Sequence, residues 1–403
     1  MQLLMMVPAY MNRLNKEYFM VRKKIIYFLL TFMLISCDGV TDSNQEQSNN
    51  SQGKLYVALQ GMGNKVAILN ASNLELIEMV DANFSDVGMM EMPHYIAIDD
   101  INGYWFVTTM MSKGVGMYSI ESNELLDVII LNNSPALFEI DTGSKTLYVS
   151  RMPDVSLTGD GMAMGSDSPD IDIINYSENG MSYSLEPYDT GFSSPHAISI
   201  SENSDIIITA SFTYDFLTKI NTLSNEIQTV SLDSAINPDP IPNINRLKPL
   251  EIVQRNGFAF INCMGGAWND DFVNGQVQVW NVSDLSKISE YQFGANSNPW
   301  HLVHHPFENK VYVALSGYLD GSTGESSLVQ LSYNAAGVLT LDWESDSSDL
   351  TQLHGIDISE NGEYIYVSSR DGRIFKFTSV SGDLLAVKDL SASTAPGGIK
   401  VNY

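Results

Sequence analysis

The residues best suited to chemistry in this sequence are its histidines, because all of them lie in or beside one recurring pattern. The pattern is a short apolar run of the form Pro-x-x-Ile-x-Ile, and in several copies histidine is the second residue. The six histidines are His94, His196, His354, His301, His304 and His305. Imidazole is the commonest protein ligand for metals, and several rings at one register can converge on one ion or small molecule. The pattern predicts a metal or ligand site, with His94, His196, His354, His301 and His304 as its candidates.

Soft side chains near the same runs would suit copper. Thioether and thiolate sulfur favour this metal over harder cations. The candidates are Met62, Met110, Met111, Met152, Met162, Met164, Cys263 and Met264. The alternative is an adaptable apolar surface in a chain that is rich in methionine, with 19 in all.

Acidic side chains in stretches rich in glycine and serine would suit calcium instead, because carboxylates supply hard oxygen ligands. They are Asp154, Asp160, Asp167, Asp170, Asp270, Asp271 and Asp320. None of these stretches has the spacing of a helix-loop-helix calcium site. Solvated acidic loops are therefore the alternative interpretation.

Several catalytic motifs are absent from the sequence. It contains no Gly-x-Ser-x-Gly nucleophile turn, no phosphate-binding glycine-rich loop and no Cys-x-x-Cys pair. Cys263 is the only cysteine besides Cys37. The sequence thus offers acid–base groups and ligands, but no recognisable covalent nucleophile.

The runs that carry the histidines read as first halves of β-hairpins. In the stretch from Leu353 to Ser369, one apolar run leads through Glu360-Asn361-Gly362 to a second run with alternating apolar residues. Asn-Gly between two such runs is the strongest short-range hairpin signal, because both residues tolerate positive φ. Equivalent starts lie near Pro93, Pro135, Pro195, Pro249, Pro299, Leu353 and Pro396. Each repeat holds four β-like segments without a helical period, which is typical of propeller blades.

The two ends of the repeat region complete each other. Residues 54–59 match the second strand of a repeat and lack the first, which is found at residues 395–401. A blade shared by both ends closes the ring and removes an exposed sheet edge. We therefore predict an all-β fold over residues 54–403: a seven-bladed β-propeller of four-stranded antiparallel blades, closed by N- and C-terminal strands that share one blade.

These motifs resemble the YVTN-repeat β-propellers, within the broader quinoprotein-amine-dehydrogenase-like group. The resemblance is carried by Pro-His-x-Ile-x-Ile-Ser, the Asn-Gly turn and strands such as Leu55-Tyr56-Val57-Ala58 and Ile365-Tyr366-Val367-Ser368. It implies that the starts of the innermost strands share one face with the loops between second and third strands. Candidate residues on that face are Met110, Met111, Met162, Met164, Cys263, Met264, Trp268, Asp270 and Trp300.

The resemblance also bears on the role of the histidines. In similar repeats a histidine after proline belongs to the repeat and bonds the backbone of a neighbouring blade. Some histidine-lined propellers are copper enzymes, nitrous oxide reductase among them, but this chain lacks that enzyme's dense histidine pairs and second copper domain. Other similar propellers hydrolyse lactones with a general acid–base pair, for which Glu, Asp and His are available here.

The N-terminus reads as an export signal. Arg22-Lys23-Lys24 precedes an apolar run at residues 25–35, and Leu34-Ile35-Ser36-Cys37 resembles the lipobox of bacterial lipoproteins. We expect residues 1–36 to be a signal peptide, with residues 1–19 a mis-assigned start, and Cys37 to be lipidated. Residues 37–53 are polar and read as a flexible tether. This places the protein on a bacterial membrane, at the periplasmic face or the cell surface.

The composition limits the classes of partner that the protein is expected to bind. A net charge of −27 argues against nucleic acid, whose binding needs clustered Lys and Arg. We expect a lipid-anchored, extracytoplasmic monomer that binds a protein, peptide or carbohydrate through its loop face. The alternative is an enzyme with a histidine-lined site at the mouth of the central channel. It would be either a metal-dependent oxidoreductase, with copper as the first candidate, or a lactonase-like hydrolase.

Overall fold

The protein is described here by a computed structural model. It covers residues 53–61, 63–85, 90–158, 161–164, 168–184, 186–233, 246–265, 273–294, 297–317, 326–346 and 348–403. All of these belong to one unit, Ser51–Tyr403. The predicted signal peptide, Cys37 and the tether up to residue 52 lie outside this range. Within it, no helix has the length and hydropathy needed to cross a bilayer.

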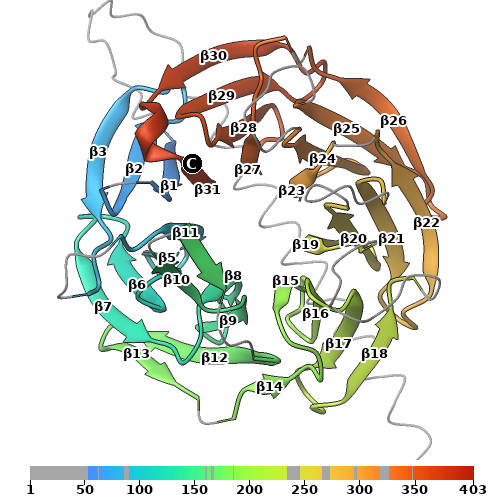
Figure 1. The fold of residues 1–403 in the computed structure, drawn as a ribbon, viewed down its shortest axis with the longest axis horizontal. Coiled ribbons are helices and arrows are strands. Elements are labelled where there is room, and N and C mark those ends of the chain that lie inside the picture. Colours follow the sequence, from blue (N-terminus) through green and yellow to red (C-terminus); the bar gives the residue numbers. More distant parts are fainter. Residues whose placement is uncertain are drawn as a thin grey trace, which may run out of the picture. The chain divides into compact units, whose positions relative to one another are not determined.

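This unit is a seven-bladed β-propeller, as the repeat predicts, and each blade is an antiparallel sheet (Figure 1). The innermost strands are β4 (Pro93–Asp99), β8 (Pro135–Asp141), β15 (Pro195–Ile200), β19 (Pro249–Arg255), β23 (Pro299–His304), β27 (Leu353–Ile358) and β31 (Pro396–Asn402). The second strands are β5 (Tyr104–Thr109), β9 (Thr146–Arg151), β16 (Ile206–Ser211), β20 (Phe258–Cys263), β24 (Lys310–Leu315), β28 (Tyr364–Ser369) and β1 (Lys54–Leu59).

The third and outermost strands complete the blades. The third strands are β6 (Gly114–Ser119), β12 (Asp170–Ser177), β17 (Phe216–Asn221), β21 (Gln276–Asn281), β25 (Ser327–Tyr333), β29 (Arg373–Thr378) and β2 (Lys65–Asn70). The outermost are β7 (Leu125–Ile130), β13 (Gly180–Tyr183), β18 (Ile227–Ser231), β22 (Lys287–Gln292), β26 (Leu339–Glu344), β30 (Leu384–Asp389) and β3 (Leu76–Asp81). The remaining elements are the hairpin β10 (Val155–Thr158) and β11 (Gly161–Met164), the short strand β14 (Tyr188–Asp189) and the 3₁₀ turn η1 (Ala392–Thr394).

The ring closes as predicted, through a blade that both ends of the repeat region share. Strand β1 pairs antiparallel with β31, in the order β3-β2-β1-β31. Each innermost strand also packs against the next one around the ring, from β4 through β8, β15, β19, β23 and β27 to β31 and back to β4. Because both ends share this blade, the ring has no open end at which an incomplete blade would be exposed.

The hairpin turns form where the Asn-Gly pairs predict them, but only the glycine takes positive φ. Gly362 has a φ of 75° and Gly103 one of 83°, whereas Asn361 and Asn102 are not in the left-handed region. Asn361 contributes through its side chain instead, because its Oδ1 accepts from the backbone N–H of Glu363 at 3.1 Å. The predicted hairpins therefore form, with only the glycine of each pair in the left-handed region.

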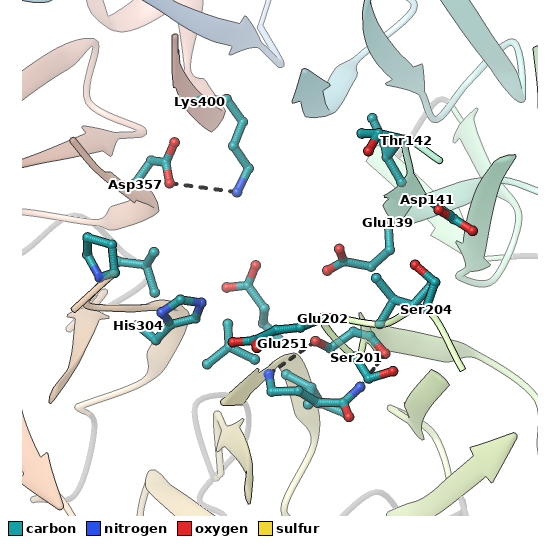
Figure 2. Close-up of a pocket in the computed structure, with 18 of the residues that line it drawn as sticks. Glu139, Asp141, Thr142, Ser201, Glu202, Ser204, Glu251, His304, Asp357 and Lys400 are labelled. Atoms are coloured by element: carbon teal, nitrogen blue, oxygen red, sulfur yellow. Dashed lines mark hydrogen bonds and ion pairs between the residues drawn. The ribbon is translucent and has the colours of Figure 1, made fainter. Parts of the chain in front are cut away.

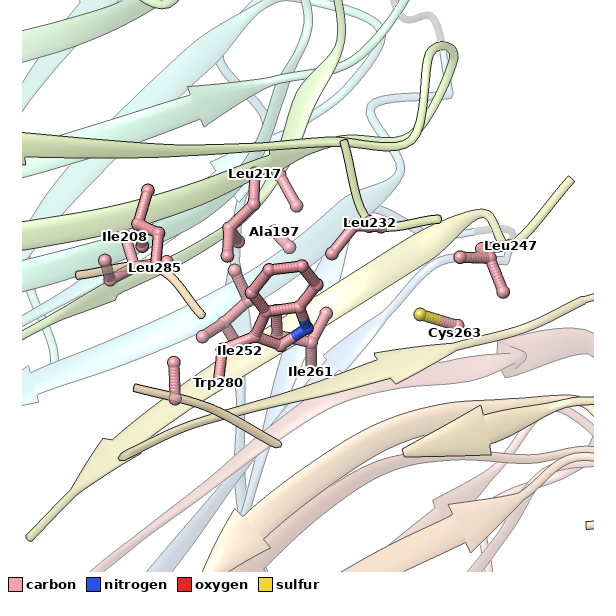
Figure 3. Packing of buried hydrophobic residues seen from close by; sticks show 12 residues of the cluster. Ala197, Ile208, Leu217, Leu232, Leu247, Ile252, Ile261, Cys263, Trp280 and Leu285 are labelled. Carbon is pink, nitrogen blue, oxygen red and sulfur yellow. The ribbon is translucent and has the colours of Figure 1, made fainter. Parts of the chain in front are cut away.

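Seven large apolar clusters make up most of the core of the described residues, and each innermost strand contributes its fourth residue to one of them. These residues are Ile96, Phe138, Ile198, Ile252, Leu302, Ile356 and Ile399. Figure 3 shows one cluster, in which Ile252 and Trp280 of one blade meet Ile208 and Leu217 of the preceding blade. Apolar packing between blades thus holds the innermost strands in place and leaves their other residues free to line the axis.

A local irregularity gives every innermost strand the same shape. Its pairing with the second strand shifts register shortly after the first residue in all seven blades. Such a bulge puts two residues opposite one and re-aims the side chains that follow. The second, third and fifth residues of these strands are the ones that build the site described next.

Candidate functional site

Four of the five predicted histidine candidates come together in the structure. The ring centres of His94 and His196 are 6.1 Å apart, and those of His94 and His354 are 6.3 Å apart. His301 lies 5.1 Å from His354, and the Trp300 ring lies at the same distance from His354. All four histidines are buried. The shared register therefore produces a real cluster, which we call the histidine cluster.

The four imidazoles are held by different partners. His196 Nδ1 lies 2.9 Å from the carbonyl oxygen of Leu250 in the next blade, so this ring bonds a neighbouring backbone, as the structural interpretation of the repeat expects. His301 Nδ1 lies 3.0 Å from Glu251 Oε2. His94 Nδ1 contacts Gln60 Nε2 at 2.6 Å, and His354 Nε2 contacts Arg370 at 3.0 Å.

Burial keeps three of the four imidazoles, those of His94, His196 and His354, uncharged. Burial lowers the pKa of His196 to about 4 and holds the pKa values of His94 and His354 well below their ordinary value. The neighbouring imidazoles and Arg370 act in the same direction on His94 and His354. These rings are therefore neutral at pH 7.

The fifth candidate, His304, lies elsewhere, in a cavity of about 820 Å³. We call this space the axial cavity, because it is lined by residues of the innermost strands and by the turns that follow them. Glu251 and Tyr95 line it from third positions, and Glu139, Asp357 and Lys400 line it from fifth positions. Figure 2 shows the side chains of Glu139, Glu251, Asp357, Lys400 and His304 around one space. A volume of this size suits a small molecule.

Two carboxyl groups in the axial cavity have pKa values that are shifted in opposite directions. Burial raises the pKa of Glu139 to about 8, and the nearby Glu251 carboxylate adds to the rise, while Lys400 opposes it. Burial alone would also raise the pKa of Glu251, but His301, Lys400 and the backbone N–H of Leu302 together lower it. At pH 7 one carboxyl is therefore largely protonated and the other ionised, which is the arrangement of an acid–base site.

A half-buried cation, Lys400, faces these acids. Lys400 Nζ lies 3.8 Å from Asp357 Oδ1. Burial alone would lower the pKa of Lys400, but Asp357, Tyr95, Glu251 and Glu139 raise it above its ordinary value. The ammonium group therefore stays charged and can stabilise negative charge that develops on a bound molecule.

His304 has the properties of a base. Its Nδ1 lies 3.0 Å from the carbonyl oxygen of His305, and because a carbonyl only accepts, this nitrogen must carry the hydrogen. The lone pair is then on Nε2. Burial lowers the pKa of His304, so the ring is neutral at pH 7 and able to take a proton. His305 itself has a turn-stabilising role, since its Nδ1 accepts from the backbone N–H groups of Phe307 and Glu308.

The described soft candidates Met110, Met111, Met152 and Cys263 pack with apolar residues. Met110 is buried and packs with Met92, Met90, Met111 and Met152 in a small methionine cluster. Cys263 lies in an apolar core cluster beside Leu247 (Figure 3), where burial raises the pKa of its thiol well above the ordinary value. Met264 is buried next to it in the chain.

Several other predicted candidates either have no described side chain or lie outside the described residues. Met162 and Met164 lie in β11, and their side chains are not described. Met62, Trp268, Asp270, Asp271, Asp160, Asp167 and Asp320 lie outside the described residues. Of the described aspartates, Asp154 pairs with Lys113 at 2.8 Å and Asp170 accepts from Ser168 at 2.6 Å. Both already have protein partners.

No group of three or more His, Cys, Asp or Glu side chains is arranged to hold a metal ion in the part of the chain that is described. Copper and calcium remain untested predictions. The unpartnered hydrogen-bond donors of the histidine cluster favour a ligand other than a metal ion.

Sequence reasoning missed Glu139, Glu251, Asp357, Lys400 and Tyr95. A usable signal was present: four of these are charged residues at the third or fifth place of otherwise apolar innermost runs. A charge inside such a strand is costly to bury unless it is paired or functional. Aligning the seven runs by place, and not only by their histidines, would have pointed to this ring.

The comparisons support the fold and leave the activity open. No family model and no curated protein matches the sequence. Among solved structures, the periplasmic gluconolactonase PpgL of Pseudomonas aeruginosa is similar with a TM-score of 0.64 at 11% identity, covering 87% of this chain and 99% of that one. A candidate 6-phosphogluconolactonase of Bacteroides uniformis matches with a TM-score of 0.62 at 11% identity and the same coverage. Hydrazine synthase of Kuenenia stuttgartiensis matches with a TM-score of 0.56 at 12% identity, covering 74% and 80%.

These similarities, all at low identity, define the class of protein: a seven-bladed β-propeller whose fold is shared with gluconolactonases and with enzymes of other chemistry. Folds of this kind host many unrelated activities, so function has to be argued from the site.

Proposed function

We propose that this propeller is a hydrolase that opens small sugar-derived lactones in its axial cavity. The observation that carries the proposal is the axial cavity itself, about 820 Å³ in volume, with a protonated Glu139, a charged Lys400 and a neutral His304 on its wall. Lactone opening needs an activated water, a group to stabilise the carbonyl oxygen and a proton donor for the departing ring oxygen. The cavity offers one residue for each task.

The step can be written with these residues. His304 Nε2 takes a proton from water, and the water oxygen forms a bond to the lactone carbonyl carbon. The Lys400 ammonium stabilises the negative charge on the carbonyl oxygen. The bond between the carbonyl carbon and the ring oxygen then breaks, and Glu139 gives its proton to that oxygen. The product is an open hydroxy acid, and the proton on His304 returns through solvent to Glu139.

Two further features favour this reaction over one with a covalent intermediate. The only cysteine among the described residues, Cys263, is buried in an apolar cluster away from the axial cavity. A lactone is also a reactive cyclic ester, which acid–base assistance alone can open. The similarity of the fold to PpgL and to the Bacteroides protein supports the choice of lactone as substrate class.

We place this activity outside the cytoplasm, on a protein anchored through a lipid on Cys37. The lipobox-like residues 34–37 support this placement. A lactone hydrolase held there would act on sugar lactones before uptake.

A binding role without turnover, for a carbohydrate, a peptide or another protein, is the second candidate. It is favoured by the polar rim of the axial cavity, where hydroxyl and carboxyl groups of Ser144, Ser201, Glu202, Ser204 and Glu360 line the opening. Such a rim suits the many hydroxyls of a sugar. This function predicts saturable binding of sugars or sugar acids with no change in the rate of lactone opening.

The test is lactone hydrolysis by the purified full chain, measured as acid release from glucono-1,5-lactone above the uncatalysed rate. Glu139→Gln and His304→Gln should each lower kcat by about 100-fold or more, the usual contribution of a general acid or base. Glu121→Gln is the matched control, because Glu121 is exposed and outside the axial cavity. Equal rates in all four proteins would refute the assignment.

A further inference from the structure

Beside the histidine cluster lies a half-buried cation, Arg370, which has no counter-ion among the described residues. Arg370 forms no ion pair, and its partners are the neutral side chains of Gln60 and His354 and the ring of Trp300, whose centre lies 5.2 Å from the guanidinium carbon. Burial lowers the pKa of Arg370 to about 10, with no carboxylate acting to raise it. A guanidinium whose Nε is buried and unpartnered is costly to leave without a counter-charge, so the missing partner is a negative charge.

Arg370 also fixes the direction of every hydrogen bond around it, because a guanidinium only donates. Its Nη2 donates to Gln60 Oε1 at 3.0 Å, which turns the Gln60 amide nitrogen towards His94. That nitrogen donates to His94 Nδ1 at 2.6 Å, so the hydrogen of the neutral His94 ring must be on Nε2. Arg370 likewise donates to His354 Nε2, so the hydrogen of His354 must be on Nδ1.

The remaining nitrogen atoms of this network are therefore hydrogen-bond donors. His94 Nε2, His354 Nδ1 and Arg370 Nε are buried and have no hydrogen-bond partner in the described structure. Each of the three is an N–H group, and none offers a lone pair. His94 is 6% and His354 1% exposed, so solvent does not satisfy these atoms from the protein surface. A buried donor left unsatisfied is costly, and three in one cluster with a cation indicate a site that is complete only with an acceptor.

A metal ion is the wrong occupant for this donor set. A metal ion binds to lone pairs, but the lone pairs of His94 Nδ1 and His354 Nε2 already accept hydrogen bonds from Gln60 and Arg370. The ion would also lie beside a positive guanidinium. An oxyanion meets both requirements, because its oxygens accept from N–H groups and its charge pairs with Arg370. Arg370 and Trp300 keep partial exposure, which gives solvent access to the guanidinium.

We propose that Arg370, His354, His94 and Gln60 form a binding site for a small oxyanion, a carboxylate or a phosphate, at the histidine-cluster end of the propeller axis. The site is separate from the proton-transfer groups of the axial cavity, and it stands whether or not that cavity hydrolyses lactones. The ring centres of His94 and His354 are 6.3 Å apart, so their two unpartnered N–H groups belong to neighbouring rings.

The sharpest test uses Gln60→Glu. Gln60 Oε1 already accepts from Arg370, so a glutamate of nearly the same shape supplies the missing counter-ion from within the chain. We expect Q60E to raise the Tm in anion-free buffer and to abolish the response to added anion. Arg370→Gln should also abolish that response, because the charge is gone.

The experiment measures the Tm of the full chain against potassium phosphate, potassium sulfate and potassium acetate, each compared with potassium chloride at equal ionic strength. The wild type should show a saturable rise with at least one oxyanion, and the three salts distinguish phosphate-like from carboxylate ligands. Arg373→Gln is the matched control: this nearby arginine pairs with Asp371, and its loss should leave the midpoint of the response unchanged.

Three results would overturn the proposal. One is a wild-type Tm that follows ionic strength alone. Another is an anion response in R370Q or Q60E as strong as in the wild type. The third, which needs no variant, is a nitrogen NMR spectrum of the labelled wild-type protein in which His94 carries its hydrogen on Nδ1 or His354 on Nε2.

Discussion

The raised pKa of Glu139 makes a quantitative prediction about stability. The perturbation is Glu139→Gln, which mimics the protonated side chain and cannot ionise. The folded protein holds this proton to a pH of about 8, whereas an ordinary glutamate loses it near 4.5. Between these values the folded state binds more protons than the unfolded chain, so the free energy of unfolding of the wild type falls as pH rises.

The magnitude follows from the gap between the two pKa values. A difference of one pH unit is worth about 1.4 kcal/mol, which sets an upper bound of about 5 kcal/mol for this group. The carboxyl is only partly buried by accessible area, so we expect about 2–4 kcal/mol after solvent screening. The glutamine variant should match the wild type near pH 5 and exceed its stability by this amount near pH 9.

The assay is urea denaturation at pH 5, 7 and 9, with Glu121→Gln as control. The exposed Glu121 should follow the wild type at every pH. Parallel stability profiles for the wild type and E139Q would refute the reasoning, because Glu139 would then ionise normally and could not donate a proton at neutral pH.

Other predictions test the remaining parts of the account. Ile252→Ala should lower the free energy of unfolding by about 2–5 kcal/mol in urea, because its side chain is 1% exposed between two blades, whereas Leu223→Ala, 84% exposed, should change it by less than about 0.5 kcal/mol. A similar loss at both sites would contradict the inter-blade core. His196 is buried with a pKa of about 4, so it is neutral in the folded protein while the unfolded chain takes up a proton below about 6.5. Wild-type stability should therefore rise from pH 4 to 6.5, by up to about 3 kcal/mol from this residue, and His196→Asn should flatten that rise in urea titrations. Cys37→Ser should move the protein from the membrane to the soluble fraction after cell lysis, and an unchanged distribution would remove the lipid anchor.

The fold was predictable from the sequence because its signals are local and repeated. Each innermost run keeps an apolar fourth residue, and the starts from Pro93 to Pro396 mark all seven blades in the structure. The shared blade of β1 and β31 followed from a missing first strand at one end and an extra one at the other. The conformation within each turn was harder to predict. The Asn-Gly pairs located the turns, but which residue takes positive φ depends on side-chain hydrogen bonds such as that of Asn361.

The candidate site was predictable only in part. A common register brought His94, His196 and His354 together, since equivalent places in the innermost strands meet at the axis, and His301 joins them from the next place along its strand. The same argument could not separate His304, which lies one place beyond the fifth and faces the axial cavity. Partners such as Gln60 and Arg370 come from the ends of second strands, 310 residues apart in sequence, and no local pattern joins them.

The measurement that tests the central claim most directly is the pH dependence of kcat/KM for glucono-1,5-lactone opening by the full chain, corrected for the uncatalysed reaction. The account predicts a bell-shaped profile. Its alkaline limb lies near pH 8, where Glu139 loses its proton, and its acid limb lies below 6.5, where His304 gains one. In E139Q the rate should fall by about 100-fold or more and the alkaline limb should vanish, while E121Q keeps both limbs. A wild-type rate no faster than buffer, or an alkaline limb that persists unchanged in E139Q, would contradict the account.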